Sequence, residues 1–301
     1  MTTATPFAAS MPAAFAPRQR FVQCLDARGL RRLAYTEWGD PANRRVLVCV
    51  HGLTRQGRDF DVLAQALCQH YRVVCPDVAG RGDSDWLADP AAYIVPTYVA
   101  DMVTLLARLD ADSVDWVGTS MGGLIGMGLA GLKGSPIRRL VLNDVGPRIE
   151  FAALARIGTY VGLPAHWSTL DEAADALAVV CQGFGPHSRE QWLALTRPQL
   201  RPDGDGFKPH YDPAIGLAFR AVTPALAQAG ELLLWQNFAR ITCPTLVLRG
   251  ELSDLLSAST VAEMCACRPQ VQAHVVAGVG HAPTLVQPDQ VAVVRDFLLS
   301  P

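Results

Sequence analysis

The sequence predicts an α/β fold, with a mostly parallel central sheet, helices on both faces of the sheet and an inserted helical cap. Short apolar, β-branched runs alternate with longer helical patterns, which is typical of parallel strands joined by helical crossovers. This alternation stops between Gly146 and about Asn237, where only amphipathic helical pattern remains. Of the 301 residues, 50% are hydrophobic, which is enough to bury the core of one large domain.

The individual elements follow from the same alternation. Strands are expected at the short apolar runs, which are residues 33–38, 46–50, 72–76, 114–118, 140–143, 245–249 and 273–277. Helices are expected between them, at residues 60–69, 97–109, 121–131, 259–267 and 288–299. Each helical stretch is about as long as a crossover between parallel strands requires.

These elements divide the chain into a flexible N-terminal arm at residues 1–19, an α/β core at residues 20–146 and 238–301, and a helical cap at residues 147–237. The arm is rich in alanine, proline and threonine, but it lacks the basic start and unbroken apolar stretch of a secretory signal. No apolar run reaches the length of a membrane span. We therefore expect a cytoplasmic protein that does not enter a membrane.

Composition limits the partners and cofactors. The formal net charge is −2 and only 18% of residues are charged, so no basic surface is expected to attract nucleic acid or an anionic membrane. The eight cysteines are scattered, and the pair Cys265 and Cys267 has no second cluster of ligands nearby. We expect reduced thiols, no metal, no cofactor, a small-molecule substrate and a monomer or homodimer.

Residues 118–122 read Gly-Thr-Ser-Met-Gly and match the pattern G-x-S-x-G. An apolar strand precedes this pattern and a helical pattern begins at Met121, which is the context of a nucleophile elbow. In such an elbow a sharp turn from strand to helix holds the serine in a strained backbone conformation. Ser120 is therefore the predicted nucleophile. The N–H of Met121, at the start of the helix, is the predicted first donor to an oxyanion.

The loop after residues 46–50 begins His51-Gly52-Leu53, and its position is that of a loop that donates a second N–H to the oxyanion. Leu53 is the expected donor, and His51 is expected to brace the loop through side-chain hydrogen bonds. The order of H-G, G-x-S-x-G, a carboxylate and a late histidine resembles the α/β-hydrolase family over about residues 21–299, as a serine esterase or lipase-like member with a helical cap. Residues 76–84 and 142–147 resemble two further segments of that family, the loop after the next strand and the exit into the cap.

The base and the acid are expected on loops that follow the last two strands. His281 lies on a glycine-containing loop after residues 273–277, from which it can reach the nucleophile as general base. The loop after residues 245–249 offers two carboxylates, Glu251 and Asp254, and Asp254 matches the family's spacing. Asp254 is therefore the predicted acid. Glu251 is one alternative, and Asp144, where some family members carry the acid, is the other.

A serine at the elbow forms an acyl-enzyme, so the substrate must carry an acyl carbon. We expect hydrolysis of a carboxylic ester of a small, largely apolar molecule, with Trp167, Tyr211 and His210 as candidate contacts in the cap. An enol-lactonase or a C–C bond hydrolase would use the same triad, and substrate profiling separates these alternatives. An acyltransferase and a ligand receptor without activity are further alternatives, which product analysis and turnover of activated esters distinguish.

Overall fold

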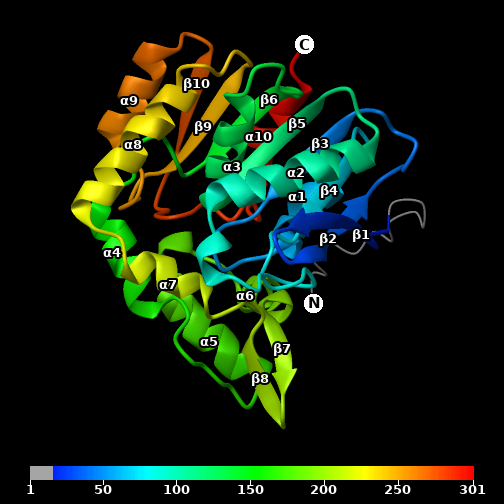
Figure 1. Ribbon diagram of the computed structural model, residues 1–301, viewed down its shortest axis with the longest axis vertical. Coiled ribbons are helices and arrows are strands. Elements are labelled where there is room, and N and C mark those ends of the chain that lie inside the picture. Colours follow the sequence, from blue (N-terminus) through cyan, green and yellow to red (C-terminus); the bar gives the residue numbers. More distant parts are fainter. Residues whose placement is uncertain (1–15) are drawn as a thin grey trace, which may run out of the picture.

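The computed structural model describes residues 16–301 (Figure 1). Residues 1–15, most of the predicted N-terminal arm, lie outside the described residues. The first strand, β1 (Arg18–Asp26), begins inside the range assigned to the arm and pairs antiparallel with β2 (Gly29–Trp38). β1 was not predicted because its side chains are mostly polar and exposed, with only Val22 and Cys24 buried. An edge strand of this kind contains no apolar run to detect.

Eight strands form one sheet in the order β1-β2-β4-β3-β5-β6-β9-β10. The six strands from β4 to β10 in this order are parallel to one another, whereas β1 and β2 are antiparallel to their neighbours. The bounds of these strands are β3 (Val46–Val50), β4 (Arg72–Pro76), β5 (Val114–Thr119), β6 (Ile137–Asn143), β9 (Thr245–Gly250) and β10 (Val271–Val276). The predicted α/β fold with a mostly parallel sheet is confirmed.

Helices cover both faces of this sheet. One face packs against α2 (Val95–Leu109), α3 (Met121–Ala130) and α9 (Ala258–Cys267). The other face packs against α1 (Asp61–Leu67) and α10 (Pro288–Leu299). Between residues 16 and 301, no helix combines the length and the apolar character needed to cross a lipid bilayer.

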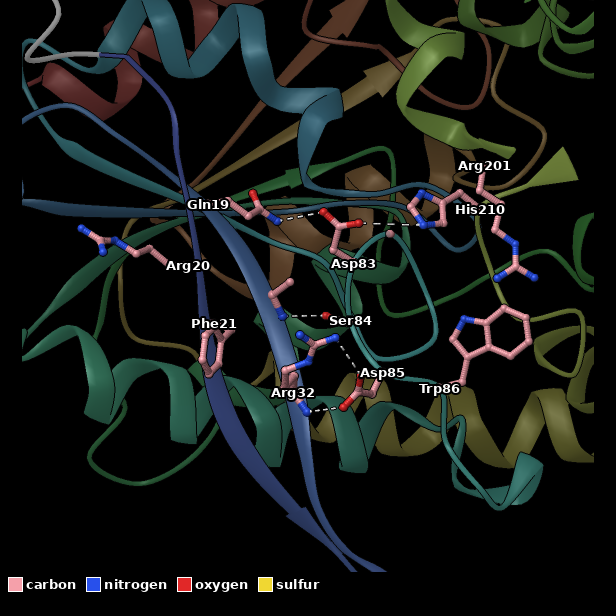
Figure 2. A pocket seen from close by; sticks show the side chains of 12 residues that line it. Gln19, Arg20, Phe21, Arg32, Asp83, Ser84, Asp85, Trp86, Arg201 and His210 are labelled. Carbon is pink, nitrogen blue, oxygen red and sulfur yellow. Dashed lines mark hydrogen bonds and ion pairs between the residues drawn. The ribbon is translucent and has the colours of Figure 1, made fainter. Parts of the chain in front are cut away.

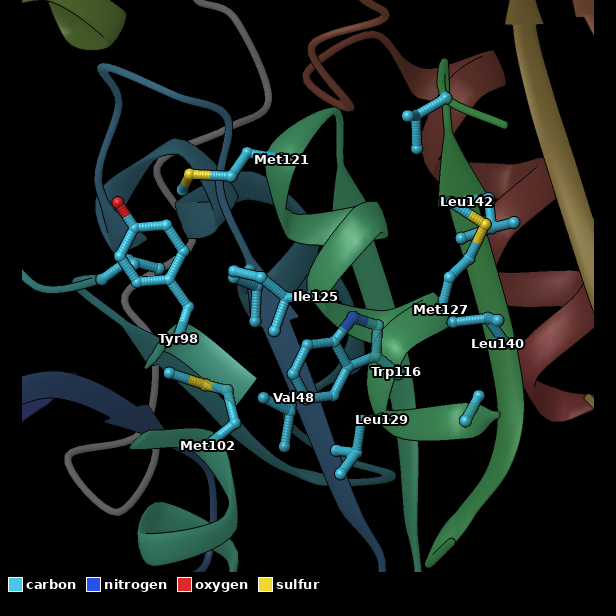
Figure 3. Packing of buried hydrophobic residues seen from close by; sticks show 14 of the residues in the cluster. Val48, Tyr98, Met102, Trp116, Met121, Ile125, Met127, Leu129, Leu140 and Leu142 are labelled. Atoms are coloured by element: carbon cyan, nitrogen blue, oxygen red, sulfur yellow. The ribbon is translucent and has the colours of Figure 1, made fainter. Parts of the chain in front are cut away.

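The core fixes α3, and with it the elbow, against the centre of the sheet (Figure 3). Trp116 on β5 is fully buried and packs beside Ile125 of α3 and Leu140 of β6. Its indole Nε1 donates a hydrogen bond to the carbonyl oxygen of Gly122 at 3.1 Å. A buried aromatic side chain with a satisfied N–H both stabilises the core and sets where the helix begins.

The segment between β6 and β9 leaves the sheet, and most of it gathers at one end of the molecule, whereas its last helix returns to pack against α3 (Figure 1). It contains α4 (Phe151–Tyr160), α5 (Leu170–Val180), α6 (Arg189–Thr196), α7 (Ile215–Arg220) and α8 (Pro224–Phe238). It also contains a hairpin of β7 (Leu200–Asp203) and β8 (Gly206–Pro209), which lies where the sequence showed only amphipathic helical pattern. The hairpin turns at Gly204, whose φ of +60° suits glycine.

Candidate active site

Ser120 stands at the sharp turn between β5 and α3. Its φ of 51° and ψ of −114° are strained values for a residue with a side chain. The turn is held by the Ser120 N–H, which donates to the carbonyl oxygen of Asn143 at 2.9 Å. It also requires glycine at 122, because a Cβ there would overlap the carbonyl oxygen of Val50. This conformation is the one that the G-x-S-x-G pattern predicts.

His281 lies beside Ser120, on the loop that follows β10. Its Nε2 is 2.9 Å from the Oγ of Ser120, which is hydrogen-bonding distance. The loop is anchored to the inserted segment, because the Gly280 N–H donates to the carbonyl oxygen of Gly183 at 2.6 Å. The inserted segment therefore helps to position the imidazole over the serine.

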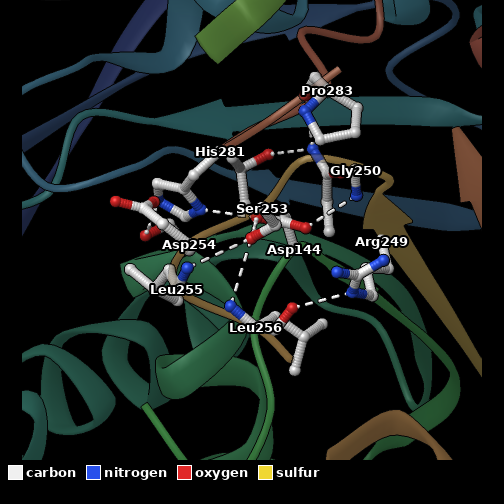
Figure 4. A network of polar contacts seen from close by, with 12 residues as sticks. Asp144, Arg249, Gly250, Ser253, Asp254, Leu255, Leu256, His281 and Pro283 are labelled. Carbon is white, nitrogen blue, oxygen red and sulfur yellow. Dashed lines mark hydrogen bonds and ion pairs between the residues drawn. The ribbon is translucent and has the colours of Figure 1, made fainter. Parts of the chain in front are cut away.

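The acid that contacts His281 is Asp144, at the end of β6 (Figure 4). Its Oδ2 lies 2.7 Å from Nδ1 of His281, and its side chain is fully buried. Two further donors hold the carboxylate: the Gly250 N–H at 2.8 Å and the Ser253 hydroxyl at 2.6 Å. Ser253 is itself oriented by the backbone N–H groups of Leu255 and Leu256.

The prediction that Asp254 contacts His281 is therefore wrong in this structure. The Asp254 side chain is 51% exposed and pairs with Arg156 at 2.7 Å. Glu251 does not reach the histidine either, because it accepts the Gly278 N–H at 2.8 Å. The physical reason is that Ser253, not Asp254, is the residue of this loop that turns inward, where it supports Asp144. The sequence analysis assigned no role to Ser253.

The two predicted oxyanion donors, Leu53 and Met121, have backbone N–H groups that donate to no acceptor among the described residues. Both residues contact the side chain of Arg81. Its Nε donates to the carbonyl oxygen of Leu53 at 2.7 Å, and its Nη2 lies 3.5 Å from the sulfur of Met121. An oxyanion hole requires backbone N–H groups without another acceptor, and Leu53 and Met121 meet this requirement among the described residues.

Arg81 is fully buried, yet it pairs with no carboxylate within the described chain. Its remaining partners are neutral, namely the Ala79 carbonyl oxygen at 2.6 Å and the Tyr98 hydroxyl at 3.0 Å. The guanidinium also lies 5.1 Å from the centre of the Tyr98 ring, in a cation–π contact. A buried positive charge without a counter-ion is costly, and here it contacts the carbonyl oxygen of Leu53 and the sulfur of Met121.

His51 braces the loop, as the sequence analysis predicted. Its Nδ1 lies 2.7 Å from the Gly52 carbonyl oxygen, and its Nε2 accepts the Val78 N–H at 2.9 Å. Burial lowers the pKa of His51 to about 3. The ring is therefore neutral near pH 7, with Nδ1 as donor and Nε2 as acceptor, and it ties two core loops together.

A cavity of about 320 Å³ opens beside Ser120 and His281, under the inserted segment. Trp167 and Tyr211, two of the three predicted substrate contacts, line it. Most of the other walls are apolar and come from α4, α5 and the loops around them: Ile157, Tyr160, Val161, Leu163, Ala176, Leu177, Val180 and Phe184. Such a cavity suits a small, mainly aliphatic molecule.

His210, the third predicted contact, lies in a different hollow of about 580 Å³ (Figure 2). There it sits 3.9 Å from Asp83, and Arg201 stacks 4.7 Å from the ring centre of Trp86. The prediction that His210 lies with Ser120 is therefore wrong. Throughout residues 16–301, no three histidine, cysteine or acidic side chains are grouped in a way that would hold a metal ion.

Comparison with known proteins identifies the family. A model of the alpha/beta hydrolase family matches residues 47–294, which include the elbow, the buried aspartate and the histidine loop. The chain belongs to the α/β hydrolase family. A solved structure of an α/β hydrolase from Novosphingobium aromaticivorans superposes with a TM-score of 0.82 at 35% identity, covering 96% of this chain and 99% of that one.

Two curated relatives cover nearly the whole α/β hydrolase chain. The 3-hydroxybutyrate-oligomer hydrolase of Cupriavidus necator is 56% identical over 285 residues, which is 93% of this chain and 97% of that protein. The pimeloyl-[acyl-carrier protein] methyl ester esterase of Photobacterium profundum is 28% identical, over 87% of this chain and 97% of that protein. The chain is thus an ester-cleaving α/β hydrolase, which confirms the reaction class expected from the sequence.

Proposed function

We propose that this hydrolase cleaves esters through an acyl-enzyme, with Ser120 as nucleophile, His281 as general base and Asp144 as the acid. The observation that carries this proposal is the continuous hydrogen-bonded line from Ser120 Oγ to His281 Nε2, at 2.9 Å, and from His281 Nδ1 to Asp144 Oδ2, at 2.7 Å. This order of groups is what nucleophilic catalysis by a serine requires.

In the first half of the reaction, His281 takes the proton of the Ser120 hydroxyl as Oγ attacks the ester carbon. The tetrahedral intermediate collapses when the bond to the alcohol oxygen breaks, and His281 returns the proton to that oxygen. In the second half, His281 takes a proton from water while the water oxygen attacks the acyl carbon. The acid leaves, Ser120 regains its proton, and Asp144 holds the imidazole in the required tautomer throughout.

The N–H groups of Leu53 and Met121 are the proposed oxyanion donors. Both are free of other acceptors among the described residues; Leu53 lies on the loop after β3, and Met121 is the first residue of α3, directly after Ser120. The charge of Arg81 adds to their effect, because in a buried site with low dielectric a fixed positive charge stabilises a developing negative one.

The proposed substrates are short oligoesters of 3-hydroxybutyrate. The relative with 56% identity is named for hydrolysis of these oligomers and aligns over 93% of this chain. The cavity of about 320 Å³ has mainly apolar walls, which fit the methyl and methylene groups of such a chain. The contacts proposed for this aliphatic chain are Trp167 and Tyr211.

The division into a core and a cap, and the cytoplasmic location, also remain proposals. In support of the division, the inserted segment contributes its own helices and a hairpin and forms much of the cavity wall. In support of a reducing compartment, all eight cysteines are free thiols.

The test is hydrolysis of 3-hydroxybutyrate dimer and trimer by the wild type and by Ser120→Ala, followed by chromatography of the products. Release of monomer by the wild type alone, with loss of fluorophosphonate labelling in Ser120→Ala, supports the proposal. Turnover of 4-nitrophenyl esters without any cleavage of the oligomers would overturn the substrate and leave the serine mechanism in place. Oligomer cleavage by Ser120→Ala would overturn the mechanism.

A further inference from the structure

The active-site cavity contains one ion pair, formed by Arg55 and Asp59. Nε and Nη2 of Arg55 each donate to a different oxygen of Asp59 at 2.7 Å, which makes the pair bidentate. The side chains are only 12% and 18% exposed. Both line the same cavity as Ser120, so a largely buried charged pair forms part of its wall.

The pair is close to the nucleophile and rigidly held. A Cβ placed on Gly52 would lie 3.8 Å from Cγ of Arg55 and 3.8 Å from Cβ of Ser120, so the two side chains start on the same side of this loop. Arg55 Nη2 also donates to the Leu195 carbonyl oxygen at 3.0 Å, and the guanidinium stacks 5.6 Å from the ring centre of Phe184. These contacts fix the direction of the guanidinium.

One nitrogen of this guanidinium is left for a ligand. Nη1 of Arg55 has no hydrogen-bond partner within the described part of the chain and is not fully buried, and Arg55 lines the cavity. Asp59 likewise keeps capacity to accept, since Oδ2 receives only the Arg55 Nε–H, while Oδ1 receives Arg55 Nη2 and Gln199 Nε2. The pair therefore offers both a donor and an acceptor at the edge of an apolar cavity.

The net charge of the Arg55–Asp59 pair determines whether a carboxylate or an uncharged hydroxyl binds beside it. Arg55 is the one arginine or lysine among the described residues that line the cavity, and Asp59 cancels its charge. A free carboxylate buried there would have no net positive charge to offset its desolvation. An uncharged hydroxyl, which both donates and accepts, matches the pair without that cost.

We propose that Arg55 and Asp59 form a subsite for the hydroxyl end of a 3-hydroxyacyl chain. This inference rests on the proposed function. A 3-hydroxybutyrate oligomer has a hydroxyl at its acyl end and a carboxylate at the other end. The subsite binds the hydroxyl end inside the cavity and leaves the carboxylate end toward solvent, so the enzyme processes oligomers from the hydroxyl end.

The first test compares three substrates of the wild type: the 3-hydroxybutyrate dimer, the same dimer with its carboxyl group as an N-methylamide, and butyryl-3-hydroxybutyrate, which lacks the hydroxyl. Loss of the hydroxyl should lower kcat/KM for the ester between the units by roughly tenfold or more. Amidation of the carboxyl end should leave kcat/KM nearly unchanged. The opposite ranking would overturn the inferred direction of binding.

The second test uses variants, and the readout is the ratio of kcat/KM for the dimer to that for its deoxy analogue. Arg55→Met should bring this ratio close to one. Asp59→Asn should raise kcat/KM for a succinyl analogue, whose acyl end carries a carboxylate, relative to the dimer, because the charge of Arg55 is then unbalanced. Arg58→Met is the matched control, since Arg58 pairs with Asp61 on the surface at 41% and 31% exposure.

The outcomes separate this inference from the proposed function. A wild-type ratio near one, or an unchanged ratio in Arg55→Met, with oligomers still cleaved through Ser120, would overturn the subsite and leave the function standing. An equal loss for all substrates in Arg55→Met would also overturn it, because that result assigns Arg55 only to holding Leu195 in place. Failure of the wild type to cleave any oligomer would overturn both.

Discussion

His281 donates through Nδ1 to the buried carboxylate of Asp144 at a distance of 2.7 Å. Asp144 directly follows β6 and Ser120 directly follows the neighbouring strand β5, so the ends of adjacent strands supply the proposed acid and nucleophile. The carboxylate is buried and held by two donors besides the histidine. This support fixes the geometry on which the imidazole depends.

The first prediction concerns which carboxylate orients the base. Asp144→Asn should lower kcat by about 10⁴, because an amide at this position favours the wrong imidazole tautomer. Asp254→Asn should change kcat little, because that side chain is half-exposed and bound to Arg156. Steady-state kinetics with 4-nitrophenyl butyrate decide the matter. A larger loss in Asp254→Asn would return the acid to the position expected from the sequence.

The second prediction concerns Ser253, whose hydroxyl donates to Asp144 at 2.6 Å. Ser253→Ala should lower kcat roughly tenfold, since a hydrogen bond to a charged group contributes about 1.5–3 kcal/mol. Ser257→Ala is the matched control. It removes a serine that caps α9 and should cost about 1 kcal/mol of stability without changing kcat. Equal kcat values for the two variants would argue against a role for Ser253.

The fold was predictable because the parallel strands are buried and therefore appear as short apolar runs, such as Val46–Val50 and Arg72–Pro76. Ser120 and His281 were predictable because local sequence determines the elbow and the late loop. The carboxylate that contacts His281 was not, because the choice between Asp144 and Asp254 depends on which side chain of a distant loop turns inward. That choice is set by tertiary packing and leaves no local pattern.

Tertiary structure also decides why Tyr211 lines the cavity beside Ser120 and His210 does not. His210 and Tyr211 are adjacent in sequence, but their side chains enter different hollows, since neighbouring residues of an extended segment point to opposite sides. A sequence can place both residues near the site without showing which one faces it.

The third prediction concerns the buried charge behind the oxyanion donors. Arg81→Met should lower kcat by about 10²-fold with little change in KM, because the lost stabilisation applies to the transition state. Affinity for a boronic acid that mimics the tetrahedral intermediate should fall in parallel. Arg31→Met is the control, because Arg31 is also buried but pairs with Asp101. It should destabilise the fold by about 3–5 kcal/mol while the folded enzyme keeps its kcat.

If Arg81→Met loses stability but keeps both kcat and boronate affinity, the guanidinium only stabilises the loops that contain Leu53 and Ala79. Boronate affinity is the decisive readout, because a purely structural residue would not change the preference for the tetrahedral species over a substrate-like ligand.

The fourth prediction concerns the pH dependence of stability. Burial lowers the pKa of His51 to about 3, whereas the unfolded chain has an ordinary value of 6.5. Below pH 6.5 the unfolded state therefore binds a proton at His51 that the folded state does not, so the contribution of His51 to the free energy of unfolding falls as pH decreases from about 6.5 toward 3. The slope due to this residue is at most about 1.4 kcal/mol per pH unit.

His51→Gln isolates this contribution, because a glutamine amide can still donate to Gly52 and accept from Val78 but does not titrate. Denaturant unfolding at a series of pH values from 4 to 8 should show the variant less stable than the wild type at pH 8, with the difference shrinking as pH falls below 6.5. A stability difference between wild type and variant that stays constant from pH 4 to 8 would mean that His51 binds a proton equally in the folded and unfolded states. That result would contradict the prediction, because a protonated Nε2 cannot accept the Val78 N–H.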